Sequence, residues 1–483
     1  MATAVVESPV GLSSTSREVF DFAMGAYDAR WDGSARLLAG AASIGATQHG
    51  VRETAMYALA LLCRDAPGDR ARAARAVDGV LGQQFDEAGA AYHGTFYRSP
   101  QEKRIAPGSK PTVWREYDPN WRHFVGCCWG VILLRFTDRV DTALRGRLVE
   151  SLVRAVDGEI ASGRLVPAYT NIALMHAFVV GLAAQLTVRA DLQSECDRYV
   201  NEITKLFDRT GTFDEYNSPT YYGVDFFALA LWRALGMTSA MREAGASIER
   251  RLWLDTARLY HAGLRNQCGP FDRTYGMDMT GYVGLQGLHL RLVLLGERAP
   301  FPALGTPMGH AHDLAAAMIY PIVPTQIPPE AMRSFDRFPG EHSERINLGD
   351  GRVVTAWLGD RVMIGGQTSP SPKDIADDHS QYRPATIHWR CADDSVGWLA
   401  LVRGQRIQAS AERSRLIVET AGGATFRVHA PNVGAASFSP NRWALSGLTL
   451  DVSTDSTSIE VAPHGSEVDV RLVGATRTVI RVA

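Results

Sequence analysis

Cysteine is scarce in this chain. The 483 residues include six cysteines, at positions 63, 127, 128, 196, 268 and 391. They form no CxxC pair and no spacing typical of zinc ligands, which excludes a disulfide-stapled scaffold and a zinc ribbon. Buried free thiols are the simpler interpretation, and they favour a reducing compartment.

An excess of charge of either sign is also missing. Lys and Arg number 50 against 52 for Asp and Glu, which gives a formal net charge of −2. A general binder of nucleic acid or of an anionic membrane needs a basic excess or a basic patch. The composition therefore predicts neither of these partners.

Long apolar runs are absent as well. No run reaches the roughly 18 residues of a membrane span. The N-terminal segment MATAVVESPVGLSS lacks the basic head and continuous apolar stretch of a signal peptide. We expect a cytoplasmic protein, or a secreted one if a leader was removed, and the sequence leaves the oligomeric state open.

Several motifs of well-known chemistries are missing. The chain has no GxxxxGK[ST] loop, no GxSxG elbow, no HExxH, and no GxGxxG between a strand and a helix. Nucleotide-driven and serine-hydrolase chemistry therefore lack support. We predict no cofactor and no metal.

Helical periodicity dominates the chain before residue 320. Apolar side chains recur at spacings of three and four, and Gly, Pro or Asp bound each segment. We predict about ten to twelve helices, among them 17–30, 51–64, 121–137, 171–187, 221–236 and 246–264. Periodicity alone does not distinguish a solenoid, a bundle and a closed α/α toroid.

The pattern changes after residue 320. Prolines at 321, 324, 328, 329 and 339 predict a linker over 321–340. In 341–483, ten short segments from RVVTAWLG to RTVIRVA alternate apolar and polar residues between turn residues. They predict an antiparallel β-sandwich. The fold class is an α+β multidomain protein, with an all-α domain over 1–320 and the sandwich over 341–483.

The segment TGTFDEYNSPTYYGVDFF (210–227) is the most informative. Ser218 followed by Pro219 predicts a helix start, because Ser caps and Pro fits the first helical position. Tyr221 and Tyr222 then fall in the first turn, where the helix dipole favours a phenolate by about 0.3–1 kcal/mol. A phenol with a pKa near 10 needs a neighbouring cation as well to ionise near neutrality. The structural alternative is a capped junction with two packed tyrosines.

The segment WREYDPNWRH (114–123) is dense in groups that bind sugars. Aromatic faces stack on apolar sugar faces, and the planar guanidinium of Arg pairs with carboxylates. The candidates are Trp114, Arg115, Trp121 and Arg122. The alternative is a helix start with arginines that extend along the surface.

A third polar segment, LRNQCGPFDRTYGMDMTGY (264–282), connects two predicted helices. Polar groups gathered in such a loop favour function over packing. They are Arg265, Asn266, Asp272, Arg273, Tyr275, Asp278 and Tyr282. The competing interpretation is a structural ion pair between Arg273 and Asp272 or Asp278.

Single polar residues in other segments have simpler interpretations. Asn171 in YTNIALMH opens an apolar helix, so capping explains it, and His176 lies about 140° away around that helix. In KDIADDHSQYRPATIHW (373–389), His379 and its aspartates favour a solvated acidic loop over a metal site. His310 and His312 in GHAH are weak metal ligands because acidic companions at ligand spacing are lacking.

The order of domains and the segment FDEYNSPTYYGV resemble the toroid-plus-sandwich polysaccharide lyases, which include heparinase II/III-like and alginate lyase-like enzymes. The resemblance implies an incomplete α/α toroid and a catalytic role for Tyr221. It also implies that Asn171 neutralises a uronate carboxylate. A histidine of the β domain reaches the cleft in this group, with His379 the first choice here and His342 the second.

Arg273 and Tyr275 are a rival catalytic pair, because an Arg-then-Tyr arrangement is similar to that of alginate-lyase-type toroids. The resemblance thus implies β-elimination on an acidic oligosaccharide or polysaccharide. The substrate-binding candidates are Trp114, Arg115, Trp121, Arg122, Tyr222, Asn217, Glu215 and Asp278.

Besides a small-molecule dehydratase or isomerase on the same toroid, two alternatives to a lyase stay open. One is a glycoside hydrolase on the same toroid, which needs two carboxylates about 5–10 Å apart. Its candidates are Glu215, Asp214, Asp225, Glu116 and Asp118. The other is a carbohydrate-binding protein without turnover, for which the aromatic clusters serve equally well.

Overall fold

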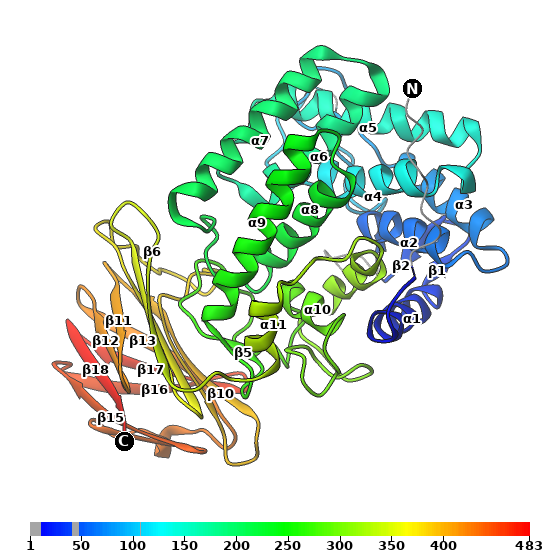
Figure 1. Cartoon of the computed structure of the whole chain (residues 1–483). Coiled ribbons are helices and arrows are strands. Elements are labelled where there is room, and N and C mark those ends of the chain that lie inside the picture. The colour runs from blue at the N-terminus through cyan, green and yellow to red at the C-terminus, as the bar shows by residue number, and fades with distance from the viewer. Residues whose placement is uncertain (1–10, 41–47, 107) are drawn as a thin grey trace.

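The computed structural model describes residues 11–40, 48–106 and 108–483. Most of the N-terminal segment on which we base the absence of a signal peptide lies outside these residues. The chain forms two parts, a helical one and a strand-rich one, which lie side by side (Figure 1).

Alternate helices of the first part form an inner ring and an outer layer, the arrangement of an α/α toroid. The inner helices, each packed on the next, are α2 (Val51–Arg64), α4 (Trp121–Arg135), α6 (Thr170–Thr187), α8 (Tyr221–Leu235) and α10 (Leu285–Arg291). The outer helices are α3 (Asp69–Leu81), α5 (Thr142–Ser162), α7 (Ala190–Thr210) and α9 (Ser239–Arg258). Helix α1 (Ser14–Asp28) and the 3-10 helix η2 (Ala311–Met318) close the ring between α10 and α2.

Side-chain pattern determines which helices are inner. Helix α6 is apolar on all sides and buried over nearly its whole length, so it fits only inside the ring. It is also long and apolar enough to cross a membrane, but 83% of it is buried within the fold, as expected of a core helix. Helix α7 instead buries one stripe, which includes Leu192, Tyr199 and Phe207, against α6.

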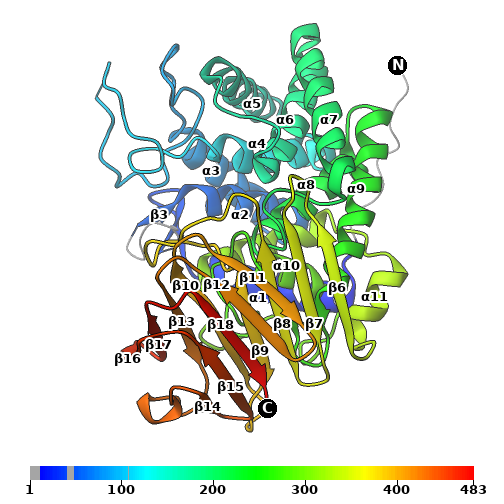
Figure 2. The ribbon, with the colours of Figure 1, turned by 90° about the vertical axis from the view of Figure 1, so that its left-hand side faces the viewer.

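The strand-rich part is an antiparallel sandwich, as the sequence predicts. One sheet has the order β16-β17-β13-β10-β9-β8-β7-β6, and the other has the order β11-β12-β18-β15-β14. Their facing side chains, among them Ile364, Leu399, Leu416 and Ile480, form one core. Figure 2 shows the two sheets beside the helices.

All ten predicted strands are present: β7 (Val353–Leu358), β8 (Val362–Thr368), β9 (Ala385–Arg390), β10 (Val396–Gly404), β12 (Arg415–Glu419), β13 (Gly423–His429), β15 (Leu448–Thr454), β16 (Ser458–His464), β17 (Glu467–Val473) and β18 (Arg477–Val482). Three further strands lack a β-branched apolar run and were not predicted: β6 (His342–Asn347), β11 (Gln408–Glu412) and β14 (Arg442–Leu445). Short strands in the helical part are β1 (Trp31–Asp32), β2 (Leu37–Ala39), β3 (His49–Gly50), β4 (Tyr260–His261) and β5 (Asn266–Gln267).

Two predicted segments differ from the structure. Helix α9 spans Ser239–Arg258 rather than 246–264: the Thr238 hydroxyl accepts a hydrogen bond from the Met241 amide at 3.1 Å and caps its start, and strand β4 follows its end. The predicted linker 321–340 contains helix α11 (Pro329–Asp336), since Pro329 fits a first helical position and Ala331 and Phe335 bury one face against the toroid.

The eight-stranded sheet packs directly on the toroid. Leu264 and Cys268 contact Val354 and Met363 of the sheet in one apolar cluster. Gly365 permits this approach, because a Cβ there would lie 1.8 Å from the carbonyl oxygen of Gly269. The polar segment 264–282 is therefore held between the two parts.

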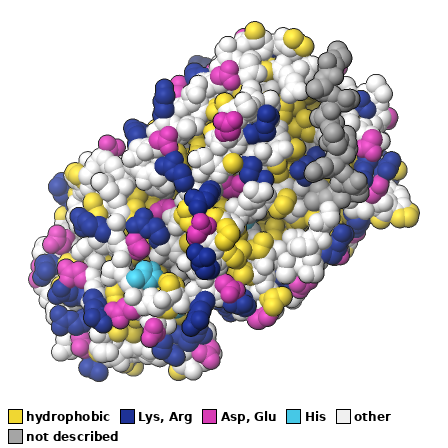
Figure 3. Space-filling view, in the orientation of Figure 1, with side chains coloured by type: hydrophobic (Ala, Val, Ile, Leu, Met, Phe, Trp, Pro, Cys, Tyr) yellow, Lys and Arg dark blue, Asp and Glu magenta, His cyan; other side chains and the backbone are white. Residues whose placement is uncertain are grey.

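Charged side chains of both signs are interspersed over both parts on the face of Figure 3. This distribution agrees with the near-zero net charge.

We predict that Gly223→Ala destabilises the toroid. A Cβ at Gly223 would lie 2.3 Å from the carbonyl carbon of Leu285, so α8 and α10 would have to separate. Overpacking of this kind costs about 2–3 kcal/mol, which thermal unfolding followed by circular dichroism would show. Gly146→Ala in α5 is the matched control, because nothing lies within 4 Å of its Cβ. Equal stability of the two variants would contradict the tight α8–α10 contact.

We predict that the buried His388 makes stability fall as pH falls. Its Nε2–H donates to the Met277 carbonyl at 3.0 Å, and burial lowers its pKa from 6.5 to about 4. Between these values the unfolded chain binds a proton that the folded chain does not, so about 2 kcal/mol is lost from pH 7 to pH 5. Urea unfolding at both pH values should show a smaller loss for His388→Gln. His379→Gln, at an exposed position, is the control, and an unchanged loss in His388→Gln would refute the assignment.

Candidate active site

A cavity of about 620 Å³ opens at one end of the toroid. The first turns of the inner helices surround it: Arg52 of α2, Asn171 of α6, Tyr221 of α8 and Leu285 of α10 line the wall. The positive ends of these helix dipoles face the cavity, which favours an anionic ligand. Its volume suits a small molecule or a short oligosaccharide.

The buried carboxylate of Glu215 holds two parts of the wall together. It accepts a hydrogen bond from Asn171 Nδ2 at 2.5 Å and an ion-paired hydrogen bond from the Arg273 guanidinium at 2.5 Å. Glu215 precedes α8, Asn171 begins α6, and Arg273 belongs to the segment between toroid and sandwich. One carboxylate therefore fixes two donors that line the same cavity.

Arg273 also contacts the predicted catalytic tyrosine. Its guanidinium carbon lies 3.7 Å from the centroid of the Tyr221 ring, and one N–H donates to the Tyr221 hydroxyl. Its Nε–H donates to Gln381 Oε1 at 2.9 Å. An arginine has five N–H donors, so hydrogen bonds to described residues leave two for a ligand.

Two phenols meet beside this guanidinium. The hydroxyls of Tyr221 and Tyr275 lie 2.5 Å apart, and both side chains line the cavity. Burial raises the pKa of Tyr221 well above its ordinary value, with a further increase from Tyr275, while Arg273 acts in the opposite direction. The dipole and one cation thus do not make Tyr221 a phenolate in the resting site.

The polypeptide before α8 sets the direction of Tyr221. The Ser218 hydroxyl accepts a hydrogen bond from the Tyr221 amide at 3.0 Å, but the helix begins at Tyr221 with Thr220 as its N-cap residue, so the predicted start at Pro219 is two residues too early. Asn217 has φ 56°, in the left-handed region, and its Nδ2 donates to the carbonyls of Cys268 and Pro270 at 2.7 and 2.8 Å. Asn217 therefore positions the loop and is buried away from the cavity wall.

Only part of the segment 114–123 reaches the cavity. Trp114 lines it and is 49% exposed, as expected of a stacking surface for a sugar. Arg115 is exposed outside the lining, and Trp121 is buried beneath the Arg52 guanidinium. Arg122 is fully buried and donates to Glu159 at 2.9 Å, so its role is structural.

Two other predicted substrate contacts also lie outside the cavity lining. The hydroxyl of Tyr222 is hydrogen-bonded to Thr212 within the core. Asp278 accepts a hydrogen bond from the Thr280 hydroxyl at 2.7 Å within its own loop. Residue type alone favours both positions, but it does not reveal the direction of a side chain.

The sandwich reaches the site through Gln381 rather than through a predicted histidine. His379, two residues away, is exposed and lies outside the cavity lining. His342 is close to the carbonyls of Gly340 and Arg258, at 2.7 and 3.2 Å, at the edge of the sheet. The role of His379 therefore stays a prediction.

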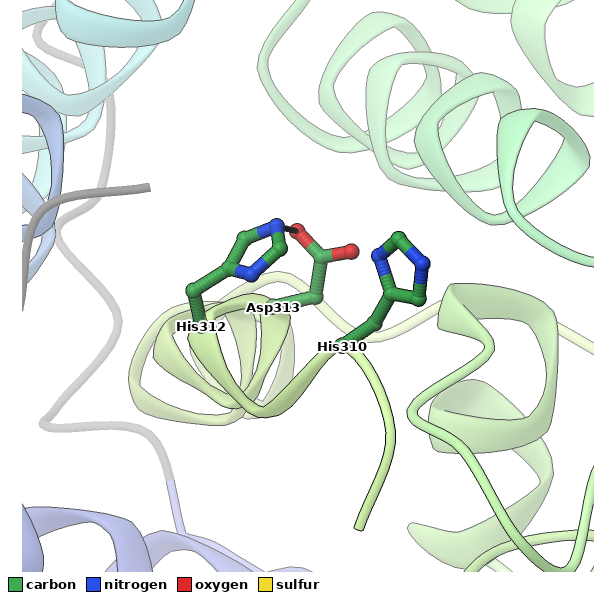
Figure 4. A group of neighbouring side chains, drawn as sticks. All are labelled: His310, His312 and Asp313. Carbon is green, nitrogen blue, oxygen red and sulfur yellow. Dashed lines mark ion pairs between the residues drawn. The ribbon is translucent and has the colours of Figure 1, made fainter. Parts of the chain in front are cut away.

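The histidines that do line the cavity come from the toroid. Figure 4 shows His310 and His312 on either side of the Asp313 carboxylate. Ligand atoms of the three residues lie within 4.8 Å of one another. His310 also stacks on Tyr275, with ring centroids 4.5 Å apart. Among the described residues, this is the group with the donor set of a metal site.

The carboxylates predicted for a hydrolase are distributed unevenly. Asp118 lines the cavity, as does Asp313, which was not predicted. Asp225 is fully buried, and its carboxyl oxygens have no hydrogen-bond partner in the part of the chain described; burial raises its pKa. Asp214 and Glu116 are exposed outside the cavity lining.

Sequence reasoning missed Arg52, Tyr169 and Asp313, which all line the cavity. The signal for Arg52 is its place in the first turn of a predicted helix, since the first turns of alternate helices meet in a toroid. Asp313 directly follows His312, so an acidic companion was present where none was noted.

Comparison with known proteins assigns most of the toroid to a family. The family model described as "Domain of unknown function (DUF8769)" matches residues 17–325, more than half of the chain. The chain belongs to the DUF8769 family. A second family model, "Domain of unknown function (DUF8770)", matches residues 345–458, within the sandwich. The DUF8769 match includes Asn171, Glu215, Tyr221, Arg273 and the histidine pair.

Solved structures show remote likeness to this DUF8769 chain. The alignment with the crystal structure of heparinase III covers 100% of this chain and 88% of the heparinase III chain, with 10% sequence identity and a TM-score of 0.45. The alignment with endoglucanase CelQ from Clostridium thermocellum, complexed with cellobiose and cellotriose, covers 98% of this chain and 93% of the CelQ chain. The sequence identity is 11% and the TM-score is 0.31. No curated protein matches the chain. At this level of similarity, these structures assign no activity to it.

We predict that Glu215→Gln destabilises the DUF8769 domain by about 2–3 kcal/mol. The change leaves the Arg273 charge without its partner, and the cost is below that of a fully buried pair because Arg273 is 32% exposed. Asp214→Asn is the matched control, since Asp214 is 63% exposed and 3.4 Å from Arg352. Denaturant unfolding should separate the two variants, and equal stability would show that Glu215 does not carry the site.

Proposed function

We propose that the protein is a carbohydrate lyase that cleaves a uronic-acid-containing oligosaccharide by β-elimination, with Tyr221 as the proton-transfer residue. This proposal rests on one observation: Asn171, Arg273 and Tyr221 lie together in the cavity wall. Such a set supplies both donors for a carboxylate and a group that moves protons.

The first requirement of the reaction is to offset the substrate carboxylate. The proton on the neighbouring carbon is weakly acidic because the carboxylate is already negative, and the intermediate carries more charge. Donors fixed in advance give the largest stabilisation of such a charge. Glu215 fixes Asn171 and Arg273, and both of these residues line the cavity.

The second requirement is a proton transfer between two atoms of one sugar. The Tyr221 phenolate oxygen takes the proton from carbon 5, and that C–H electron pair forms the double bond to carbon 4. The bond from carbon 4 to its oxygen breaks with its electron pair, and Tyr221 gives the same proton to the leaving oxygen. The residue returns to its phenolate form, so no co-reactant is needed.

The surroundings of Tyr221 fit this cycle. The Arg273 N–H is within hydrogen-bond distance of its oxygen and favours the phenolate, whereas the neighbouring Tyr275 hydroxyl acts in the opposite direction. The titratable groups that act on it are Tyr275, Arg273 and Glu215, and burial is the dominant cause of its raised pKa. We therefore expect the rate to increase with pH, since the active phenolate is a minor form near neutrality.

We predict that Tyr221→Phe lowers the elimination rate by a factor on the order of 10² to 10⁴, the usual contribution of acid–base catalysis. The assay uses uronate oligosaccharides and follows the ultraviolet absorbance of the unsaturated product. Tyr222→Phe is the matched control, because its hydroxyl is bonded to Thr212 outside the cavity lining. Full activity of Tyr221→Phe would exclude Tyr221 as the proton-transfer residue. Loss of activity in Tyr275→Phe alone would assign that role to Tyr275.

A glycoside hydrolase is the second candidate, because Asp118 and Asp313 both line the cavity. Burial raises the pKa of Asp118, as a general acid requires. The same assay separates the two reactions: a hydrolase releases reducing ends without new ultraviolet absorbance. In that case Asp118→Asn, not Tyr221→Phe, abolishes turnover.

A further inference from the structure

We propose that His310, His312 and Asp313 bind a divalent transition-metal ion, with zinc the best fit, in the wall of the cavity. The three residues lie in the sequence GHAHD, just before and at the start of η2. This site does not depend on the proposed elimination, because it rests on a different set of side chains.

The geometry is close to that of a metal site. Zinc ligands at 2.0–2.1 Å from the ion lie about 3.4 Å from one another in a tetrahedron. His312 Nε2 and Asp313 Oδ1 are already 3.6 Å apart. All three ligand atoms are within 4.8 Å of one another and each side chain is half-buried, so the three groups have to approach one another slightly to hold an ion.

The surrounding contacts leave these groups available. Nδ1 of His310 is buried and has no hydrogen-bond partner in the ranges that the structure describes. A buried polar atom of this kind is unfavourable without a partner, and a metal ion supplies one. The backbone of His310 has φ 52°, in the left-handed region, which directs the residue differently from His312.

The nearest competing cation is Arg52. Its guanidinium lies 4.0 Å from Asp313 Oδ1, beyond hydrogen-bond distance, and it donates twice to Glu53 at 2.8 and 3.0 Å. Glu53 therefore accepts from two of the five N–H groups of Arg52, and Asp313 forms only this longer ion pair with it. The ring of Tyr275 stacks on the His310 imidazole.

The donor set indicates the kind of ion and its accessibility. Two imidazoles and one carboxylate suit zinc and its neighbours, whereas magnesium and calcium prefer oxygen ligands alone. Three protein ligands leave a coordination position open, as in catalytic zinc sites. Because all three residues line the cavity, that position faces a bound ligand. It would accept a carboxylate or hydroxyl oxygen.

The test is metal binding by the full chain. After treatment with a chelator, the protein is titrated with zinc chloride in a calorimeter, and with cobalt chloride while visible absorption is recorded. We expect one zinc ion per chain and the absorption bands of low-coordinate cobalt. His312→Ala and Asp313→Asn should each weaken zinc affinity more than about 100-fold. Circular dichroism of the metal-free variants checks their folding.

His379→Ala is the matched control, because His379 is exposed on the acidic loop that contains Asp374, Asp377 and Asp378. It should bind zinc as the unmodified protein does. Failure of the unmodified protein to bind zinc stoichiometrically at micromolar concentration would overturn the proposal. Unchanged affinity in His312→Ala, or loss only in His379→Ala, would overturn it too. Since activity is not the readout, failure of the lyase proposal leaves this result unaffected.

Discussion

The buried carboxylate of Glu215 is the interaction on which the site depends. It joins Asn171, at the start of an inner helix, to Arg273, in the segment held by the sandwich. Without it, the amide and the guanidinium would be oriented independently. A buried ion pair is not a strong source of stability, because desolvation offsets most of the attraction. Its value here lies in fixing the positions of two donors.

Packing between the two parts gives that carboxylate its partner. The amide and carbonyl of Phe271 pair with those of Arg383, each at 2.9 Å, and the Thr274 amide donates to the Gln381 carbonyl at 2.9 Å. Arg273 lies between these two anchored residues, and the Gln381 side chain binds its Nε. The sandwich thus acts on the cavity by holding one loop of the toroid in place.

The sequence predicts the architecture better than the site. Periodicity identifies helices and ten strands because one buried face repeats along each element. It does not identify β6, β11 and β14, because they lack a β-branched apolar run. Residue type pointed to Asn171, Tyr221 and Arg273, and the structure brings them together. It also pointed to Arg122 and Tyr222, which are buried away from the cavity. The local sequence pattern predicts where a helix begins. Which helix starts lie together around the cavity depends on the order of the helices in the ring.

The cavity has two chemically different regions, and this difference gives a ligand a direction. Asn171 and Arg273 present N–H donors on the Tyr221 side of Tyr275, whereas His310, His312 and Asp313 lie on its other side, with the Arg52 guanidinium 4.0 Å from Asp313. Tyr275 connects them, since it bonds to Tyr221 and stacks on His310. An acidic sugar fits with its carboxylate toward the donors and its hydroxyls toward the histidine pair and Asp313. A metal ion bound by the histidines would strengthen that preference by placing a cation where the hydroxyl oxygens lie.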